Sequence, residues 1–194
     1  LYKDVVDKKG DLLNSIIEKF ESKEDEIEEF ILSFIRERVA QRIATITKRH
    51  DIIDAVVNSN TSSVPEQLKA AKVLSAVSES EEFKGITEAL NRVINISAKA
   101  QDDASGEILE DRLETASERT LVKAIKELHS KVQTLTPEEL YSHLEALAPK
   151  INDFFNENMV MVDDEATRRN RLRFLGLLSQ IILDFADFTS LIVK

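Results

Sequence analysis

Apolar residues recur at helical spacing through almost the whole chain, with polar residues between them. This pattern predicts eight helices, in chain order at about residues 4–19, 23–45, 51–57, from 63, from 80, 107–130, from 136 and 164–192. No segment alternates polar and apolar residues as a strand does. Most of the helices have one apolar side that must be covered by a neighbour. The chain is therefore predicted to be all-α, a single helical bundle of about eight helices.

The same pattern divides the chain into two regions. Residues 1–22 are expected to form an N-terminal helix that leads in from the rest of a longer protein, because the chain opens at Leu1 and not at a methionine. Residues 23–194 are expected to form the helical domain itself. A polar segment at 58–64 is its best candidate for a flexible joint.

Composition narrows the function classes. The 194 residues carry a net charge of -10 and no cysteine, so disulfides and thiolate metal sites are excluded, and a cytoplasmic location is expected. No apolar run is long enough to span a membrane. The charge is uneven: Arg36–Arg49 holds five basic residues and one glutamate, net +4, whereas 102–118 holds seven acids and one arginine, net -6. An acidic protein with a local basic site fits this distribution.

Residues that carry out catalysis are not grouped in this sequence. The histidines, His50, His129 and His143, have no partner at the spacing of a helical zinc site, and the four glycines are isolated, so no phosphate-binding loop is predicted. Neighbouring acids such as Glu138 and Glu139 are expected at a helix start, where Thr136 caps and a proline follows. We therefore expect no catalytic centre and no metal site.

Arginines at the ends of two apolar stripes are the most informative polar residues. On a helical plot Arg171 continues the stripe of Leu175 and Leu178, with Arg168 at its edge, while Arg169 and Arg173 point away. Arg38 and Arg42 continue the stripe of the helix at 23–45 in the same way. Two interpretations stay open. The arginines are structural, paired with acids such as Asp51, Asp54 or Glu165, or they line a pocket for an anion or for unstacked bases.

Three blocks in consistent order carry a resemblance to a known family. They are Phe34–Val39 followed by Arg49–Val56, then Phe83–Ile96, then Phe154–Leu172. In these blocks the chain resembles the DALR group of all-helical anticodon-binding domains, in the form found at the C-terminus of the bacterial glycyl-tRNA synthetase beta subunit. The tetrapeptide that gives the group its name stands here as Glu165-Ala166-Thr167-Arg168, with threonine in place of leucine. The acidic stretch 102–118 resembles a variable surface region between the second and third blocks.

The resemblance implies a function in translation. It implies that the chain binds the anticodon region of tRNA(Gly) and catalyses nothing alone, while the complete enzyme uses ATP with Mg and an alpha subunit, in a heterotetramer. Splayed bases and phosphates would be bound by Arg38, Arg42, Lys48, Arg49, Arg92, Asn95, Arg168, Asn170 and Arg171. The alternative is a helical protein-interaction or scaffold domain without RNA binding, which would account for the acidic surface.

Overall fold

The computed structural model describes residues 23, 26, 27, 29–99 and 106–193. The helix predicted at 4–19, and with it the predicted N-terminal region of residues 1–22, lies outside the described residues. The chain forms two compact units, Leu1–Gln41 and Arg42–Lys194, and each is described by itself.

Residues 29–43 form one continuous helix, within the helix predicted at 23–45. In the first unit Val39 of this helix is 6% exposed, whereas five other apolar side chains are 45–71% exposed, those of Phe30, Ile31, Leu32, Phe34 and Ile35. The sequence pattern predicts that a neighbouring helix covers this stripe. Within the described residues of the first unit, no helix covers these five side chains.

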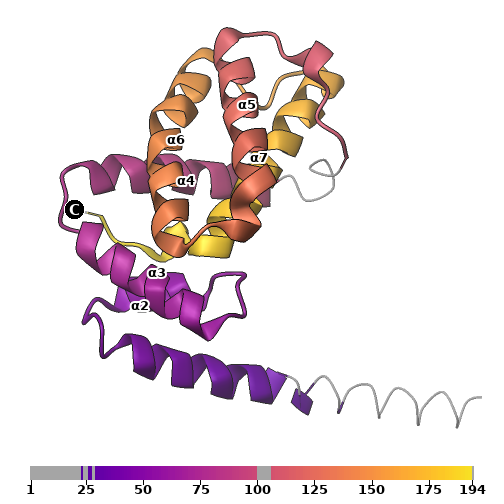
Figure 1. The fold of residues 1–194 in the computed structure, drawn as a ribbon. Coiled ribbons are helices and arrows are strands. Elements are labelled where there is room, and N and C mark those ends of the chain that lie inside the picture. Colours follow the sequence, from indigo (N-terminus) through magenta and orange to yellow (C-terminus); the bar gives the residue numbers. More distant parts are fainter. Residues whose placement is uncertain (1–22, 24–25, 28, 100–105, 194) are drawn as a thin grey trace, which may run out of the picture. The chain divides into compact units, whose positions relative to one another are not determined.

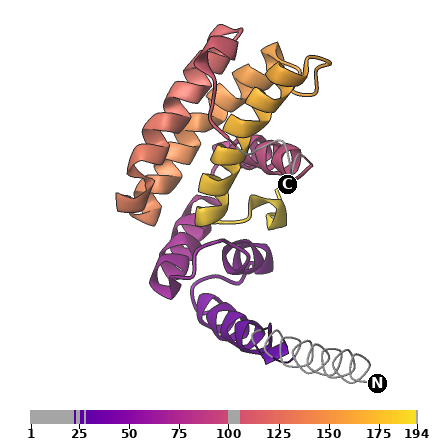
Figure 2. The same cartoon turned by 90° about the vertical axis from the view of Figure 1, so that its right-hand side faces the viewer.

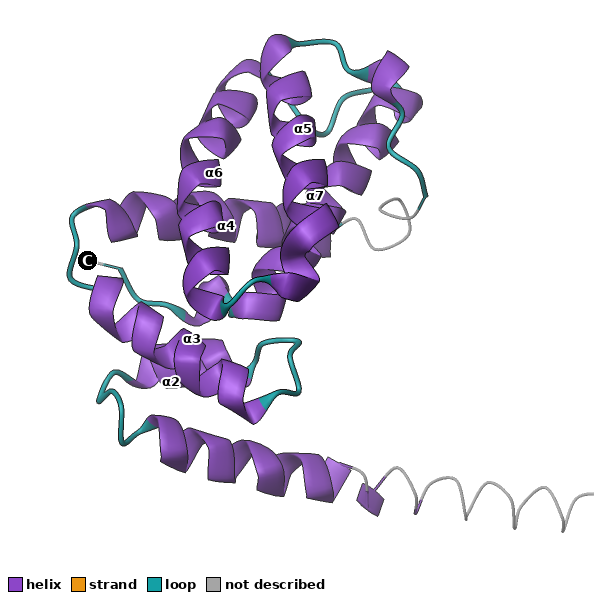
Figure 3. Cartoon of the chain, in the orientation of Figure 1, coloured by secondary structure: helices purple, strands orange, loops and turns teal. Residues whose placement is uncertain are grey.

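The described residues of the second unit contain six further α-helices, connected by loops and single 3-10 turns (Figure 1). Their bounds are α2 (His50–Val57), α3 (Val64–Val77), α4 (Glu82–Ala98), α5 (Ala116–Lys131), α6 (Pro137–Glu157) and α7 (Glu165–Phe185). The 3-10 turns are η1 (Glu110–Arg112), η2 (Val132–Thr134) and η3 (Phe188–Ser190). No strand occurs in the described ranges, as Figure 3 shows, so the all-α prediction is confirmed.

Local sequence accounts for where two of these helices begin. Thr136 accepts a hydrogen bond from the Glu139 N–H while the Glu139 carboxylate accepts one from the Thr136 N–H, and Pro137 occupies the first turn. Thr115 and Glu118 form the same capping box at the start of α5. Such boxes satisfy backbone N–H groups that a helix start leaves without intrahelical partners. The predicted start at Thr136 is thus confirmed.

The core of the second unit lies among α4, α5, α6 and α7. The most extensive helix contacts are between α4 and α7, followed by those of α6 with α5 and with α4. In Figures 1 and 2, α5 and α6 run side by side and α4 crosses them. Phe154 and Phe174 are fully buried and meet edge to face, with 5.3 Å between ring centroids. Aromatic pairs of this kind contribute about 0.5–1.5 kcal/mol beyond the burial of their surface.

Two predicted helices are shorter than the apolar pattern suggests. The helix expected at 107–130 begins only at Ala116, and the residues before it are extended around the single turn η1. Gly106 at the start of this segment has φ +108, and a Cβ there would lie 3.2 Å from Cζ of Arg173. The helix expected at 164–192 ends at Phe185, and η3 follows. The helix expected to start at Ser80 starts at Glu82.

Candidate nucleic-acid interface

The first turn of α7 is organised by an acidic cap. Asp164 accepts a hydrogen bond from the Thr167 N–H at 2.7 Å, and this bond holds the pKa of the Asp164 carboxyl below its usual value. Thr167 is 4% exposed, and its hydroxyl lies 3.5 Å from a carboxylate oxygen of Glu114. The residue that departs from the family tetrapeptide therefore faces a polar neighbour.

Arg171 is the centre of a buried hydrogen-bond network. Its Nε donates to Glu118 at 2.6 Å and its Nη2 to Glu114 at 2.9 Å. The same guanidinium donates to Asn158 at 3.4 Å and to the Met159 carbonyl at 2.9 Å. The Arg171 side chain is 5% exposed and that of Glu118 is 1% exposed. We call Arg171, Glu118 and Asn158 the arginine node, because they join α7, α5 and the end of α6.

Glu118 connects this node to the start of α5. One carboxylate oxygen accepts from Arg171, and the other accepts from the N–H groups of Glu114 and Thr115. The sequence proposed Asp51, Asp54 or Glu165 as partners for buried arginines, and for Arg171 that choice is wrong. The structure supports the structural interpretation of Arg171 with different acids. It also corrects the expectation that all of 102–118 is surface, since Glu118 is 0% exposed.

Arg168 and Asn170 also hold neighbouring segments. Arg168 Nη1 donates to the Val162 carbonyl at 3.0 Å, in the loop between α6 and α7. The Asn170 amide bonds both the N–H and the carbonyl of Leu109, at 2.8 and 2.9 Å, and the residue is 1% exposed. Asn170 therefore fixes the extended segment before α5. The side-chain amide of Asn170 is not exposed to a ligand in this arrangement.

Arg169 and Arg173 lie on the outer side of α7, as the helical plot predicts. Arg169 forms an ion pair with Glu165 at 2.6 Å, one helical turn away. Arg173 donates to the Glu107 carbonyl at 3.2 Å. The four arginines of this helix start thus contact different neighbours.

The basic residues between 38 and 48 are exposed. Arg38 stacks on Phe34, with Cζ 5.1 Å from the ring centroid, and bonds Gln41 at 3.4 Å. Arg42 is exposed. Lys48 is exposed as well and donates to the Ala44 carbonyl at 3.1 Å. These cations are accessible to an anionic ligand.

Arg49 does not lie free in a solvated loop, which was the simplest expectation for it. Its guanidinium binds both oxygens of Asp51, at 3.1 and 2.6 Å, and the Ile192 carbonyl at 3.0 Å. The Ile192 N–H donates back to Asp51 at 3.0 Å. Burial opposes ionisation of Asp51, but the hydrogen bonds from Arg49 and Ile192 outweigh it, and the pKa of Asp51 is lowered. Arg49 therefore ties the segment after η3 to the start of α2.

One face of α4 collects exposed cations. Arg92 and Asn95 lie on it, as the sequence predicts for Arg92, and both are exposed. At 100° per residue the same face carries Lys84, Glu88 and Lys99, all within about 80° and along about 22 Å of helix. We call these five residues the α4 face. Sequence reasoning missed Lys84 and Lys99, although their spacing to Arg92 on one helix was available as a signal.

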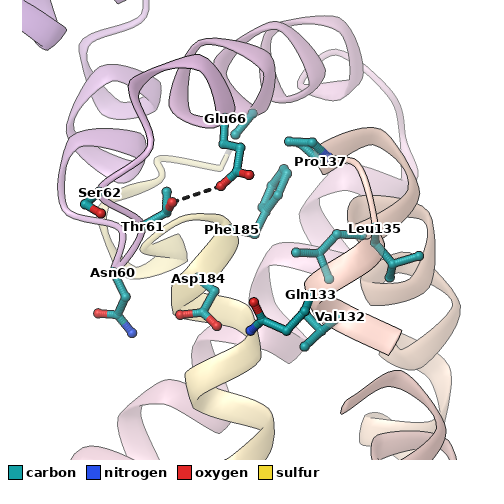
Figure 4. Close-up of a pocket in the computed structure, with 12 residues that line it drawn as sticks. Asn60, Thr61, Ser62, Glu66, Val132, Gln133, Leu135, Pro137, Asp184 and Phe185 are labelled. Carbon is teal, nitrogen blue, oxygen red and sulfur yellow. Dashed lines mark hydrogen bonds between the residues drawn. The ribbon is translucent and has the colours of Figure 1, made fainter. Parts of the chain in front are cut away.

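Hollows on the second unit border the α4 face at Lys84 and at Arg92, and another lies apart from it. One of 530 Å³ is lined by Arg49, Lys84 and Ile192 among others, and one of 510 Å³ by Arg92, Phe155, Met159 and Met161 among others. Lys84 and Arg92 thus connect the α4 face with two hollows. Another, of 290 Å³, is shown in Figure 4, where Thr61 donates to Glu66 at 3.1 Å. Burial raises the pKa of Asp184 in its wall, and this hollow holds two carboxylates.

Metal-binding clusters and membrane-spanning helices are both absent from the described residues. Those residues contain no group of three or more histidine, aspartate or glutamate side chains that could hold a metal ion. Within the same ranges, none of the helices is long and apolar enough to cross a membrane.

Comparison with known proteins identifies relatives over most of the chain. A beta subunit of glycine–tRNA ligase from Pediococcus pentosaceus is 33% identical over 164 residues, which cover 84% of this chain and 24% of that protein. The corresponding subunit from Lacticaseibacillus casei is 37% identical over 162 residues, 84% of this chain and 23% of its own length. The beta subunit from Lactobacillus acidophilus is 33% identical over 183 residues, which cover 94% of this chain and 26% of that protein. The chain spans about a quarter of the length of these relatives.

A family match covers the region of the chain that holds the arginine node and most of the α4 face. The family described as the DALR anticodon binding domain matches residues 86–187, which is more than half of the 194 residues. The matched range runs from the first turns of α4 through α5, α6 and α7. It includes most of the second block and all of the third block on which the resemblance was based. The chain belongs to the DALR anticodon-binding domain family.

Proposed function

We propose that this chain is the tRNA anticodon-binding portion of a glycine–tRNA ligase beta subunit. It would contribute recognition of tRNA(Gly) to the ATP-dependent formation of glycyl-tRNA. The family match and the names of the relatives support this proposal. Under this proposal, ATP and magnesium act elsewhere in the complete enzyme. The alpha subunit is a second partner, in a heterotetramer. The enzyme works in the cytoplasm with the rest of translation.

The observation that carries the proposal is the α4 face in a domain of this family. Three cations and one carboxylate lie on it, and the exposed N-cap residue Glu81 is a second carboxylate on the same side, in a chain whose net charge is -10. No hydrogen bond or ion pair joins Lys84, Arg92 or Lys99 to another of the described residues. Cations spread along about 22 Å of one helix face can contact phosphates of an RNA strand, and phosphate contacts supply much of the affinity of RNA-binding proteins.

The predicted site residues divide into two groups under this proposal. Direct contacts with RNA are proposed for the exposed residues, Arg38, Arg42, Lys48, Arg92 and Asn95. An indirect contribution is proposed for Arg49, Arg168, Asn170 and Arg171, whose donors are committed to neighbouring segments. These four would hold the segments that carry the RNA-contacting surface.

Titration of this chain with glycine tRNA at two salt concentrations tests the proposal. We expect the affinity to fall as salt rises, because cations condensed on the phosphates are released on association. The double substitution Lys84→Glu with Lys99→Glu should weaken binding strongly. It should also reduce the salt dependence by about one unit of slope for each phosphate that the variant no longer binds.

A matched control separates a local effect from a change in total charge. Lys69→Glu with Lys72→Glu makes the same change of total charge at two exposed lysines on α3, which lie outside the α4 face and the hollows described above. We expect this pair to change the affinity far less than the double reversal on α4. Absence of salt-dependent binding to any tRNA by the unmodified chain would contradict the proposal.

A second candidate function is a helical protein-interaction domain that does not bind RNA. The exposed apolar side chains of residues 29–43 favour it, because a row of apolar side chains in water marks a surface that a partner covers. Polar substitutions Phe30→Ser and Ile31→Ser distinguish the two functions. Weakened association with the alpha subunit, in a chain that shows no salt-dependent binding of tRNA, would support the protein-interaction domain. Salt-dependent tRNA affinity that the substitutions leave unchanged would support the RNA-binding function.

A further inference from the structure

A stacked pair of side chains lies on the second unit outside the arginine node. The Arg92 guanidinium lies over the Phe155 ring, with Cζ 4.0 Å from the ring centroid. Phe155 is 7% exposed, whereas Arg92 is exposed. The guanidinium therefore covers the ring, and both residues line the hollow of 510 Å³. No hydrogen bond or ion pair joins Arg92 to another described residue, so its N–H edge is also available.

Two methionines border the same hollow. Met159 is 72% exposed and Met161 is 62% exposed, in the loop between α6 and α7. We call Arg92, Phe155, Met159 and Met161 the stacking platform. Exposed apolar side chains beside a planar cation suit a ligand with flat apolar faces and a polar edge.

The loop that carries the methionines is held in place from α7. Arg171 donates to the Met159 carbonyl at 2.9 Å, and Arg168 donates to the Val162 carbonyl at 3.0 Å. Between these two points Val160 is 6% exposed, and its carbonyl accepts from the Val162 N–H at 3.1 Å. The backbone on both sides of Met161 is thus anchored. A surface fixed before binding loses less conformational entropy when a ligand arrives.

We propose that the stacking platform binds one unstacked base of a tRNA loop. This inference rests on the proposed function, names a base as the group that Arg92 contacts, and adds Met159 and Met161 to the site. The base stacks on the open face of the Arg92 guanidinium, and Met159 and Met161 cover its remaining apolar surface. Arginine planes and aromatic rings are the usual supports for splayed bases in RNA recognition.

Charge distinguishes the base from the phosphates around it. Glu157 lines the hollow together with Arg92, and a carboxylate there repels a phosphate but accepts a hydrogen bond from a base N–H. The phosphates would instead contact Lys84 and Lys99 on the α4 face. The stacking platform and the α4 face would therefore bind different chemical groups of the same RNA strand, a base and phosphates respectively.

The test uses an anticodon stem-loop of glycine tRNA in which one loop base at a time is removed. The unmodified chain should lose about tenfold in affinity at one abasic position, because stacking of a base contributes at that scale. Arg92→Lys keeps the charge and loses the planar surface, so it should bind the complete stem-loop about tenfold more weakly with an unchanged salt dependence. At the critical abasic position the affinities of Arg92→Lys and the unmodified chain should become equal.

Three outcomes are decisive. Equal costs of every abasic substitution in the unmodified chain and in Arg92→Lys would overturn the base site and leave the proposed function standing. Absence of binding of the complete stem-loop and of glycine tRNA by the unmodified chain would contradict both. If Arg92→Lys and Met159→Ser with Met161→Ser leave RNA binding unchanged but weaken association with the alpha subunit, the platform is a protein contact and the base site is overturned. Arg119→Lys, at an exposed position on α5, is the matched control and should change nothing.

Discussion

Arg171 and Arg92 lie in the same unit and within the same family match, yet they are placed in opposite ways. Arg171 is 5% exposed on its side chain and donates four hydrogen bonds to other segments. Arg92 is exposed and stacks on a ring. The acids that pair with Arg171 lie 53 and 57 positions away in the sequence. A run of arginines along the chain therefore does not locate a binding surface until the distant acids are known.

The sharpest test of this comparison is removal of the buried guanidinium. Arg171→Ala leaves Glu118 buried without a cation, and loss of one member of a buried pair costs about 3–5 kcal/mol. We expect the free energy of unfolding, measured with urea, to fall by that amount. Arg169→Ala, which removes an exposed pair with Glu165 on the same helix, should cost less than about 1 kcal/mol. Similar losses for the two variants would contradict the assignment of Arg171 to the core.

Asn170 offers an intermediate effect in the same region. Asn170→Ala removes the two hydrogen bonds to the backbone of Leu109, an exposed residue, and a typical hydrogen bond contributes about 0.5–1.5 kcal/mol. Hydrogen exchange of the Leu109 amide should become faster in the variant than in the unmodified protein. An unchanged exchange rate would mean that Asn170 does not hold the segment before α5.

Substitution of Arg92 should affect stability much less than substitution of Arg171 and should mainly affect RNA binding. Arg92→Ala removes a contact with the Phe155 ring at the surface, which contributes about 1 kcal/mol or less to stability. We expect a small change in urea unfolding together with a large loss of RNA affinity. A loss of stability as large as that of Arg171→Ala would remove the distinction between the two arginines.

The smallest effect is expected from acid, at the pair of Arg49 and Asp51. Because the pKa of Asp51 is lowered in the folded protein, its contribution to stability is complete above the unfolded pKa and is lost as pH falls through the folded value. We expect stability to decline below about pH 4. Asp51→Asn should make this decline shallower, whereas Asp163→Asn, at an exposed position, should leave it unchanged.

Much of the helical architecture could be predicted from local sequence. The capping box at Thr136 and the apolar side of α4 at Phe83, Ile86 and Leu90 are determined by residues within one helix, and both are found as predicted. The opposite face of α4, with Arg92, follows from the same periodicity. Patterns confined to one element were therefore sufficient for these features.

The features that sequence reasoning failed to predict depend on tertiary contacts. Residues before Ala116 have helical spacing, but Asn170 and Arg173 bond the backbone of Leu109 and Glu107 in an extended form. Glu118 was counted with an acidic surface because its partner Arg171 is distant in the sequence. Burial of Phe155 beneath Arg92 likewise depends on the contact between α4 and α6. Local periodicity contains no information on such contacts.

The arginine node also constrains how this family can diverge. Glu118 caps α5 and pairs with Arg171, which also donates to Asn158, so loss of either Glu118 or Arg171 removes the buried ion pair that joins α5 to α7. Tolerated sequences should therefore replace the three together, for instance by apolar residues that fill the same volume. Residues 118, 158 and 171 would then vary as a set among homologues. The residues of the α4 face would be free to change one at a time as the RNA they contact changes.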